Sequence, residues 1–179
     1  MSDNFDLDDA IRKVEGFPKE GIVFYDITSI LSNPAAFSYC TAEMVKMYRN
    51  KSIDGIVAVE ARGFLFAAPL AEKLGIPLIL ARKKGKLPGK VIERSFALEY
   101  GEDVIQIQEN DIKIGENILL IDDLVATGGT LKATAELIEA SGANVFEICC
   151  IIGLPFLNNF EPLKKYKLTT LINFNSESM

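Results

Sequence analysis

The chain has 179 residues, a length typical of one domain with a single hydrophobic core. Hydrophobic residues make up 49% and charged residues 25%, which is the mix of an ordinary globular protein rather than a disordered one. Nineteen basic and 25 acidic residues give a net charge of −6, which argues against binding of nucleic acid or an anionic membrane over a broad basic surface.

Histidine is absent, which excludes hydrolase mechanisms with a histidine base and zinc sites with histidine ligands. The three cysteines, Cys40, Cys149 and Cys150, lack zinc-site spacing and are expected to be buried free thiols. No apolar stretch is long enough to span a membrane, and the N-terminus lacks the basic and apolar regions of a signal peptide. We therefore expect a cytoplasmic protein.

The first fifty residues are predicted to hold two helices. Residues 7–15 predict a short helix with Asp6 as its N-cap. Residues 17–31 contain Pro and Gly and are expected to be irregular. Asn33 followed by Pro34 predicts the N-cap and first residue of a second helix.

A strand, a helix and a second strand follow. Residues 55–59 form a short apolar run that suits a strand buried on both faces. Residues 63–74 predict a helix that ends at Gly75, and residues 77–81 form a second apolar run. This order predicts a parallel pair of strands with a helical crossover.

The next segment is strongly basic. Residues 82–94 contain six of the 19 basic residues and one acid, together with Gly and Pro. A long basic excursion inside a compact domain is usually functional or disordered.

The second half of the chain continues the alternation. Strands are predicted over residues 104–108, half-exposed, and over 117–121, 145–152 and 168–174, with a helix over 130–140. This pattern predicts an α/β fold with a doubly wound, mostly parallel sheet and flanking helices.

One strand end carries a pattern suited to a phosphate group. The buried run ends in Asp122 and Asp123, and residues 126–130, Ala-Thr-Gly-Gly-Thr, lead into a helix. Paired glycines let backbone N–H groups converge, and the helix N-terminus adds a positive dipole. The two carboxylates suit ribose hydroxyls or a hydrated Mg²⁺. The alternative is a tight strand-to-helix turn capped by Asp123 or Thr127, which leaves two acids on an apolar strand unexplained.

Residues 121–130 resemble the motif that binds 5-phosphoribosyl 1-diphosphate (PRPP) in the type I phosphoribosyltransferase family. Other segments resemble the adenine-specific members, in their order and spacing: residues 17–24, 60–66, 82–88 and 98–101. The resemblance covers nearly the whole chain. It implies one phosphoribosyltransferase domain over residues 1–179, with an N-terminal helix and base-covering hood over 1–32 and a flexible active-site loop over 82–95.

The resemblance also implies an activity and a set of site residues. The family members in question join adenine to PRPP with Mg²⁺, giving AMP and diphosphate. Ala126, Thr127, Gly128, Gly129 and Thr130 would then bind the 5′-phosphate. Asp122 and Asp123 would meet the ribose hydroxyls, directly or through Mg²⁺ held mainly by substrate and water.

The basic residues would face the diphosphate. By resemblance these are Arg62, Arg82, Lys83 and Lys86, with Arg82 acting within its own site or across a dimer interface. Without the resemblance, Arg62 could form a surface ion pair with Glu60, and the basic segment could be a solvated loop.

The purine would be handled by two further segments. Glu99 would act as general acid/base at purine N7, although its segment alone predicts a strand end entering a turn. Phe24 would stack on adenine, or serve as simple core, while Val23 and Tyr25 would offer backbone groups to the base. Tyr25 stands where the family often has Arg or Lys, and Phe96 where it commonly has Tyr, which puts base preference and loop closure in question.

Two other functions are compatible with these residues. One is phosphoribosyl transfer to another purine base, and the other is a regulator that binds PRPP as a signal. The absence of a basic, DNA-binding extension disfavours the regulator. The resemblance further implies a homodimer, with no nucleic acid or membrane partner.

Overall fold

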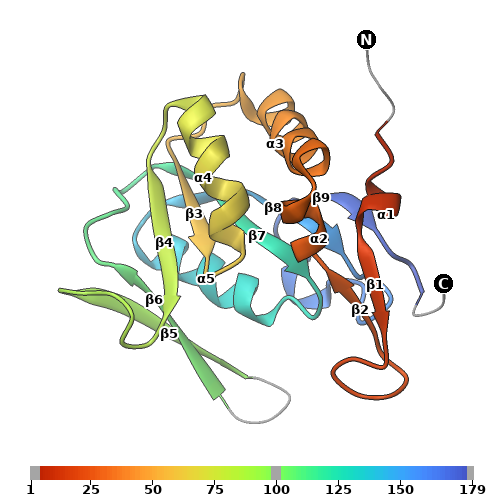
Figure 1. Cartoon of the computed structure of the whole chain (residues 1–179). Coiled ribbons are helices and arrows are strands. Elements are labelled where there is room, and N and C mark those ends of the chain that lie inside the picture. Colours follow the sequence, from red (N-terminus) through yellow and green to blue (C-terminus); the bar gives the residue numbers. More distant parts are fainter. Residues whose placement is uncertain (1–4, 98–101, 177–179) are drawn as a thin grey trace.

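The computed structural model describes residues 5–97 and 102–176, which form an α/β fold around a seven-stranded sheet (Figure 1). The strand order is β5-β6-β4-β3-β7-β8-β9. The strands are β3 (Gly55–Val59), β4 (Leu78–Lys83), β5 (Val91–Ala97), β6 (Glu102–Gln108), β7 (Asn117–Val125), β8 (Asn144–Gly153) and β9 (Leu168–Asn173). The five strands β4, β3, β7, β8 and β9 are parallel. Strand β6 is antiparallel to both of its neighbours, β4 and β5. The predicted mostly parallel sheet is confirmed.

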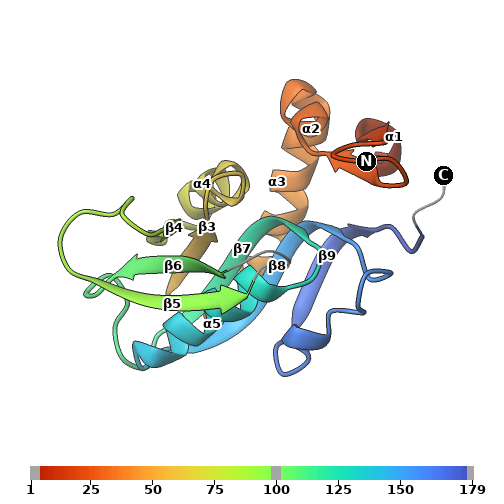
Figure 2. The same ribbon diagram turned by 90° about the horizontal axis from the view of Figure 1, so that it is seen from below.

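Helices cover both faces of the sheet. Figure 2 shows α3 (Pro34–Tyr48) and α4 (Gly63–Leu74) on one side and α5 (Gly129–Ala140) on the other. Side chains of β7 alternate between two hydrophobic clusters: Leu119 and Ile121 pack with α3 and α4, whereas Ile118 and Leu120 pack with α5. This two-sided burial explains why the central strand β3 and the first part of β7 are continuously apolar in sequence.

The predicted helix boundaries are confirmed where local capping determines them. Asn33 Oδ1 accepts hydrogen bonds from the amides of Ala35 and Ala36, and Pro34 is the first residue of α3. Helix α4 ends at Gly75, whose φ of +68° is the left-handed conformation favoured at helix C-termini.

The N-terminal hood differs from the prediction. It contains α1 (Leu7–Ala10), β1 (Arg12–Glu15), β2 (Val23–Asp26) and α2 (Thr28–Ser32). Asp6 does cap the first helix, but that helix ends at Ala10 and the rest of the predicted helix is a strand. The reason is antiparallel pairing of β1 with β2, a contact that local helix spacing cannot reveal.

Tyr25 and Lys13 connect the hood to the chain's C-terminal region. Tyr25 of β2 is buried and stacks on Phe174, with ring centroids 4.1 Å apart. The Tyr25 hydroxyl donates a hydrogen bond to the carbonyl of Ser176 at 3.2 Å, and Lys13 Nζ lies 5.2 Å from the Phe174 ring centroid. Tyr25 therefore anchors the hood.

The basic segment, residues 82–95, is also more regular than predicted. Its first residues belong to β4 and its last ones to β5, because β6 pairs with both strands. The turn between them contains Gly85 and Gly89, with φ of +80° and +75°. Residues 82–83 and 91–95 therefore lie in strands, and the flexibility of an active-site loop over residues 82–95 stays a prediction.

Two other strands, β6 and β7, differ from the sequence prediction in burial or length. Strand β6 is present, but Ile105, Gln106 and Ile107 are all buried, so it is not half-exposed. Strand β7 continues to Val125, because its pairing with β8 persists through Asp122 and Leu124. A short 3₁₀ helix, η1 (Glu161–Leu163), precedes β9. In the described part of the chain, no helix is long and apolar enough to cross a membrane.

Candidate active site

The predicted phosphate-binding segment lies between β7 and α5 and forms a turn that we call the phosphate loop, residues 126–130. Gly128 is the N-cap of α5, with φ of +82° and no side chain capping the helix. The first amides of α5 are therefore free to bind an anion. A Cβ at Gly128 would lie 3.0 Å from Leu163 Cγ, so the site requires glycine for both conformation and space.

The two acids lie inside β7 rather than after it. Asp122 Oδ1 accepts a hydrogen bond of 2.8 Å from the amide of Asp123, whose side chain is buried. Gly63 begins α4 directly above this point, and a Cβ there would lie 3.0 Å from Ile121 O and 3.1 Å from Asp122 Oδ1. Glycine thus allows α4 to approach β7 and brings Arg62 to the acids.

The carboxylates carry an electrostatic cost in the ligand-free protein. Burial, followed by the charge of Asp123, raises the pKa of Asp122 well above its usual value. Burial also raises the pKa of Asp123, against the opposing charge of Arg62. Arg62 Nε lies 2.8 Å from Asp123 Oδ2, yet this buried oxygen accepts no hydrogen bond within the described residues. The two carboxylates can therefore still accept a hydrogen bond from a ligand or bind a cation.

Three of the four basic residues predicted to face diphosphate are paired with acids, Arg62 among them. Arg82 Nε donates a hydrogen bond to Glu60 Oε2 at 2.8 Å, and the Lys83 amide donates to Glu60 Oε1 at 2.9 Å. Lys83 Nζ lies 2.7 Å from Asp103 Oδ2. Exposed Lys86 meets Arg82 through its carbonyl, which accepts from Arg82 Nη1 at 3.2 Å.

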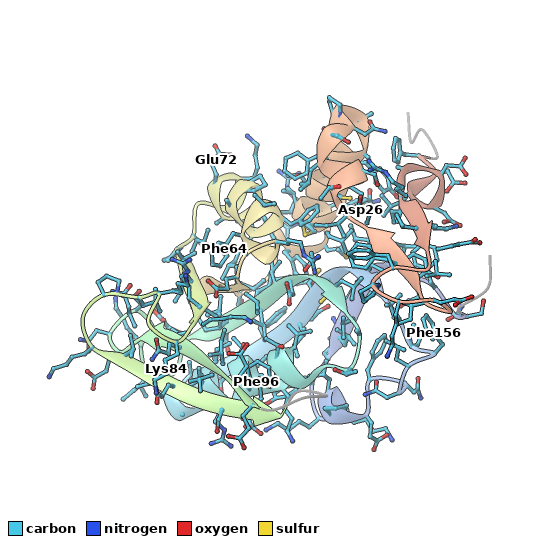
Figure 3. All side chains as sticks on the ribbon, turned by 60° about the horizontal axis from the view of Figure 1, so that its bottom comes forward. Asp26, Phe64, Glu72, Lys84, Phe96 and Phe156 are labelled. Carbon is cyan, nitrogen blue, oxygen red and sulfur yellow. The ribbon has the colours of Figure 1, made fainter. Side chains whose placement is uncertain are left out.

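A cleft of about 300 Å³ joins many of these groups at the carboxyl ends of the central strands. Its walls include Arg62, Lys83, both acids of β7 and the whole phosphate loop. Arg82 and Lys86 do not line it, although Glu60, the partner of Arg82, does. In Figure 3, Phe96 of β5 and Asp26 of the hood lie on opposite sides of this edge.

The residues predicted to bind adenine lie in the hood, outside the cleft wall. Half-buried Phe24 contacts Phe17 edge-to-face, with ring centroids 5.1 Å apart, and Val23 is half-buried beside it. The hydrogen bond from Thr28, with smaller contributions from Arg12 and Arg62, lowers the pKa of Asp26 at the end of β2. The charge of Arg62 thus reaches the hood. Glu99 lies outside the described residues, as do its neighbours at positions 98, 100 and 101.

The sequence did not reveal three partners of the predicted residues. Glu60 and Asp103 neutralise basic side chains, and Asn158 Nδ2 donates a hydrogen bond of 2.9 Å to the carbonyl of Thr127. Glu60 directly follows the buried strand β3, which is a usable signal for a cleft residue. Asp103 and Asn158 are placed by tertiary contacts and carry no such signal.

The acidic side chains of the cleft indicate how a metal ion could be bound. Among residues 5–97 and 102–176, no group of three or more acidic or cysteine side chains could enclose a metal. Two adjacent carboxylates, one with a buried oxygen that accepts no hydrogen bond, fit a Mg²⁺ ion that takes its other ligands from water and phosphate oxygens.

Comparisons with known proteins agree with this geometry. Residues 26–174 match the family model described as "Phosphoribosyl transferase domain". Adenine phosphoribosyltransferase of Treponema denticola is 52% identical over 97% of this chain and 91% of its own length. The enzyme of the same name from Clostridium acetobutylicum is 44% identical over 95% of this chain and 99% of its own length.

Solved structures show the same likeness. Adenine phosphoribosyltransferase of Thermoanaerobacter pseudethanolicus superimposes with a TM-score of 0.89 at 40% identity, over 94% of this chain and all of that one. The enzyme from Saccharomyces cerevisiae, solved with an imino-altritol bisphosphate and adenine, gives a TM-score of 0.86 at 37% identity. That match covers 93% of this chain and 96% of the yeast chain.

Proposed function

This chain belongs to the phosphoribosyltransferase family, among its adenine phosphoribosyltransferases, and from that premise we propose how its residues perform the reaction. The enzyme transfers the 5-phosphoribosyl group of PRPP to adenine, giving AMP and diphosphate. One observation supports the proposed site most strongly: a single cleft joins the phosphate loop, the half-buried Asp122, the buried Asp123 and two basic side chains.

The reaction exchanges one bond at ribose C1′ for another. In the adenine tautomer protonated at N7, the bond from C1′ to the diphosphate oxygen breaks with its electron pair on oxygen, the N9 lone pair forms the new bond to C1′, and the N7 proton is lost to a base. Positive charge develops on the ribose in between. Asp122 and Asp123, when ionised, stabilise that charge from within a low-dielectric site and accept hydrogen bonds from the ribose hydroxyls.

The two phosphate-bearing ends of PRPP have different sites in this proposal. The amides of residues 126–130 bind the 5′-phosphate, because the start of α5 offers free N–H groups and a positive dipole. Arg62 and Lys83 bind the diphosphate from the cleft wall. Arg82 and Lys86 join them once the turn that carries Lys86 moves toward the cleft, within one chain or from a second one.

Mg²⁺ bound to PRPP would be reached by Asp122 and Asp123 and would neutralise part of the diphosphate charge. The carboxylates orient the ribose beside it. The two carboxylates of β7 therefore have two roles: they bind the ribose hydroxyls and they attract the cation that accompanies PRPP.

The hood supplies the adenine site. Phe24 stacks on the base, and the backbone groups of Val23 and Tyr25 face its polar edge, where donors and acceptors distinguish a 6-amino from a 6-oxo purine. Glu99 is the base that accepts the N7 proton as N9 bonds to C1′, and it returns that proton in the reverse reaction. Burial of Tyr25 against Phe174 means that its side chain positions the hood.

We further propose that the enzyme is a cytoplasmic homodimer. This assignment rests on the resemblance to its family. Light scattering at several concentrations tests the dimer: a mass of one chain at all of them contradicts it.

The experiment that tests the activity offers one purine at a time with PRPP and Mg²⁺ and measures the nucleotide formed. AMP from adenine, with no product from hypoxanthine, guanine or xanthine, is the expected result. Product from 6-oxopurines contradicts the proposed base site while leaving phosphoribosyl transfer intact. PRPP binding without product from any base contradicts the proposed catalytic roles.

A further inference from the structure

The segment after β8, residues 154–163, contacts the phosphate loop and contributes no residue to the wall of the cleft. The amide of Leu154 donates a hydrogen bond to Val125 O at 2.9 Å, which ties the segment to the end of β7. Leu163, in η1, packs directly against Gly128. The phosphate loop therefore lines the cleft and is held by a segment that does not.

Asn158 makes the polar contact in this support. Its Nδ2 donates to the carbonyl of Thr127 at 2.9 Å, and its Oδ1 accepts from the amide of Phe160 at 3.0 Å. Because one end of the side-chain amide donates and the other accepts, the orientation of the group is determined. Among the described residues, no other side chain forms a hydrogen bond with residues 126–129.

The backbone around Asn158 is unusual in a way that keeps this orientation. Asn159 and Phe160 have φ of +50° and +55°, the two non-glycine residues in the left-handed region within the described chain. Phenylalanine rarely adopts that region. The turn is maintained by a 2.7 Å hydrogen bond from the Asn159 amide to Pro155 O and by packing of Phe160 against the hydrophobic cluster under α5.

The carbonyl of Thr127 matters because it can oppose an anion. Gly128 has no Cβ and a positive φ, so the peptide between Thr127 and Gly128 can rotate at little conformational cost. Rotation would turn the Thr127 oxygen toward the cleft and the Gly128 N–H away from it. A phosphate would then meet a negative dipole in place of a donor.

We propose that Asn158 is a positioning residue for the 5′-phosphate of PRPP. It holds the Thr127 carbonyl on the outer side of the loop and thereby keeps the loop amides directed at the phosphate. This inference rests on the proposed function, since it concerns the same loop, and it assigns to a residue outside the cleft a role in binding one end of the substrate.

The test compares Asn158→Ala with Asn144→Ala. Asn144 begins β8 at the opposite end of that strand, where its Nδ2 lies 3.5 Å from Asn117 Oδ1, so the control makes the same chemical change away from the site. Calorimetry measures binding of ribose 5-phosphate and of diphosphate, and steady-state kinetics measures KM for PRPP and for adenine. We expect Asn158→Ala to weaken ribose 5-phosphate binding about three- to tenfold, the usual effect of one lost hydrogen bond.

Diphosphate affinity and the KM for adenine should stay within about twofold of wild type in both variants, because the loop contacts neither ligand. Equal ribose 5-phosphate affinity in wild type and Asn158→Ala overturns the inference, and so does equal weakening of both ligands, which marks a merely structural role. Should Asn158→Ala fail to fold, the isosteric Asn158→Asp removes the donor and is subject to the same criteria. A wild-type protein that forms no AMP contradicts the proposed function instead, so the two failures are distinguishable.

Discussion

The phosphate loop and the basic side of the cleft are both proposed to bind phosphate groups, yet they are built from different chemical groups. The loop uses backbone amides at the start of α5, around buried Gly128. The basic side uses long side chains, and three of its four are already paired with acids: Arg62 with Asp123, Arg82 with Glu60 and Lys83 with Asp103.

This difference shows two ways to prepare an anion site in a protein with a net charge of −6. Backbone amides are neutral, so dissolved salt weakens their contacts with a ligand less than it weakens contacts of charged side chains. They also need no ion-pair partner before the ligand arrives. Charged side chains are stabilised by neighbouring acids until the ligand displaces them, so binding includes the cost of breaking ion pairs. The loop should therefore depend on shape, and the basic side on charge and salt.

The largest effect is expected for Gly128→Val. A side chain there would meet Leu163 and could not hold φ at +82°, so the loop would lose its shape. We expect at least about a hundredfold loss of PRPP affinity, seen as loss of the PRPP-dependent rise in Tm.

The matched control is Gly142→Val. Gly142 has the same φ of +82°, and a Cβ there would lie 3.1 Å from Ile114, but it follows α5 at that helix's other end. This variant should lose stability and keep its PRPP-dependent shift. Retention of the shift in Gly128→Val would show that the loop does not carry the phosphate.

A smaller effect is expected for Arg62→Lys, which keeps the charge but removes the planar fork of donors. Diphosphate affinity, measured as product inhibition, should fall about tenfold, while ribose 5-phosphate affinity should change by less than about twofold. Equal weakening of both ligands would mean that Arg62 organises the whole cleft rather than the diphosphate site.

Asp103→Asn should act in the opposite direction. Removal of this carboxylate frees Lys83 Nζ and makes the cleft less negative, so diphosphate should bind about two- to fivefold more tightly at low ionic strength. The gain should disappear near about 0.5 M salt, where exposed charges are screened. Weaker binding would show that Asp103 positions Lys83 for the ligand rather than competing with it.

Asp122→Asn should give the smallest change, in the stability of the ligand-free protein. The folded protein binds an extra proton at Asp122 because the pKa of its carboxyl is raised. Its contribution to stability is complete below the ordinary value of 3.8 and is lost as pH rises through the folded-state pKa. Asparagine does not ionise, so the Asp122→Asn protein should not lose this stability as the pH rises. Its side-chain oxygen can still accept the hydrogen bond from the Asp123 amide.

Thermal unfolding between pH 4 and 8 measures this effect. The Tm of Asp122→Asn should exceed that of wild type near pH 8 and match it near pH 4. Each kcal/mol gained in the free energy of unfolding should raise the Tm by about 2–4 °C. Exposed Asp111 provides the control, since Asp111→Asn makes the same chemical change at a position outside the cleft. A lower Tm at pH 8 would mean that the ionised carboxylate stabilises the fold.

Sequence alone predicted the parts of the fold that local chemistry determines. Asn33 with Pro34, Gly75 and the glycines of the phosphate loop each mark a boundary through capping or backbone conformation, and the structure has each boundary there. The buried parallel strands were equally visible, because burial on both faces leaves a continuous apolar run.

The rest depends on partners that are distant along the chain. Residues 12–15 have helical spacing but form a strand because β2 is available to pair with them. Asp122 stays in β7 because it pairs with Cys150 of β8. The acids that pair with the basic side chains were missed for the same reason: charge along the sequence does not show which cation each acid meets.

The stack of Tyr25 on Phe174 has a consequence for how the protein is made. Tyr25 also reaches Ser176, 151 residues later along the chain, so the hood cannot take its final place until the ribosome has synthesised and released that region. Until then the hood has only its contacts with earlier parts of the chain, such as the stack of Phe5 on Tyr39 of α3, while the sheet forms behind it. A stop codon just before Phe174 would leave a nearly complete sheet whose hood lacks its aromatic anchor.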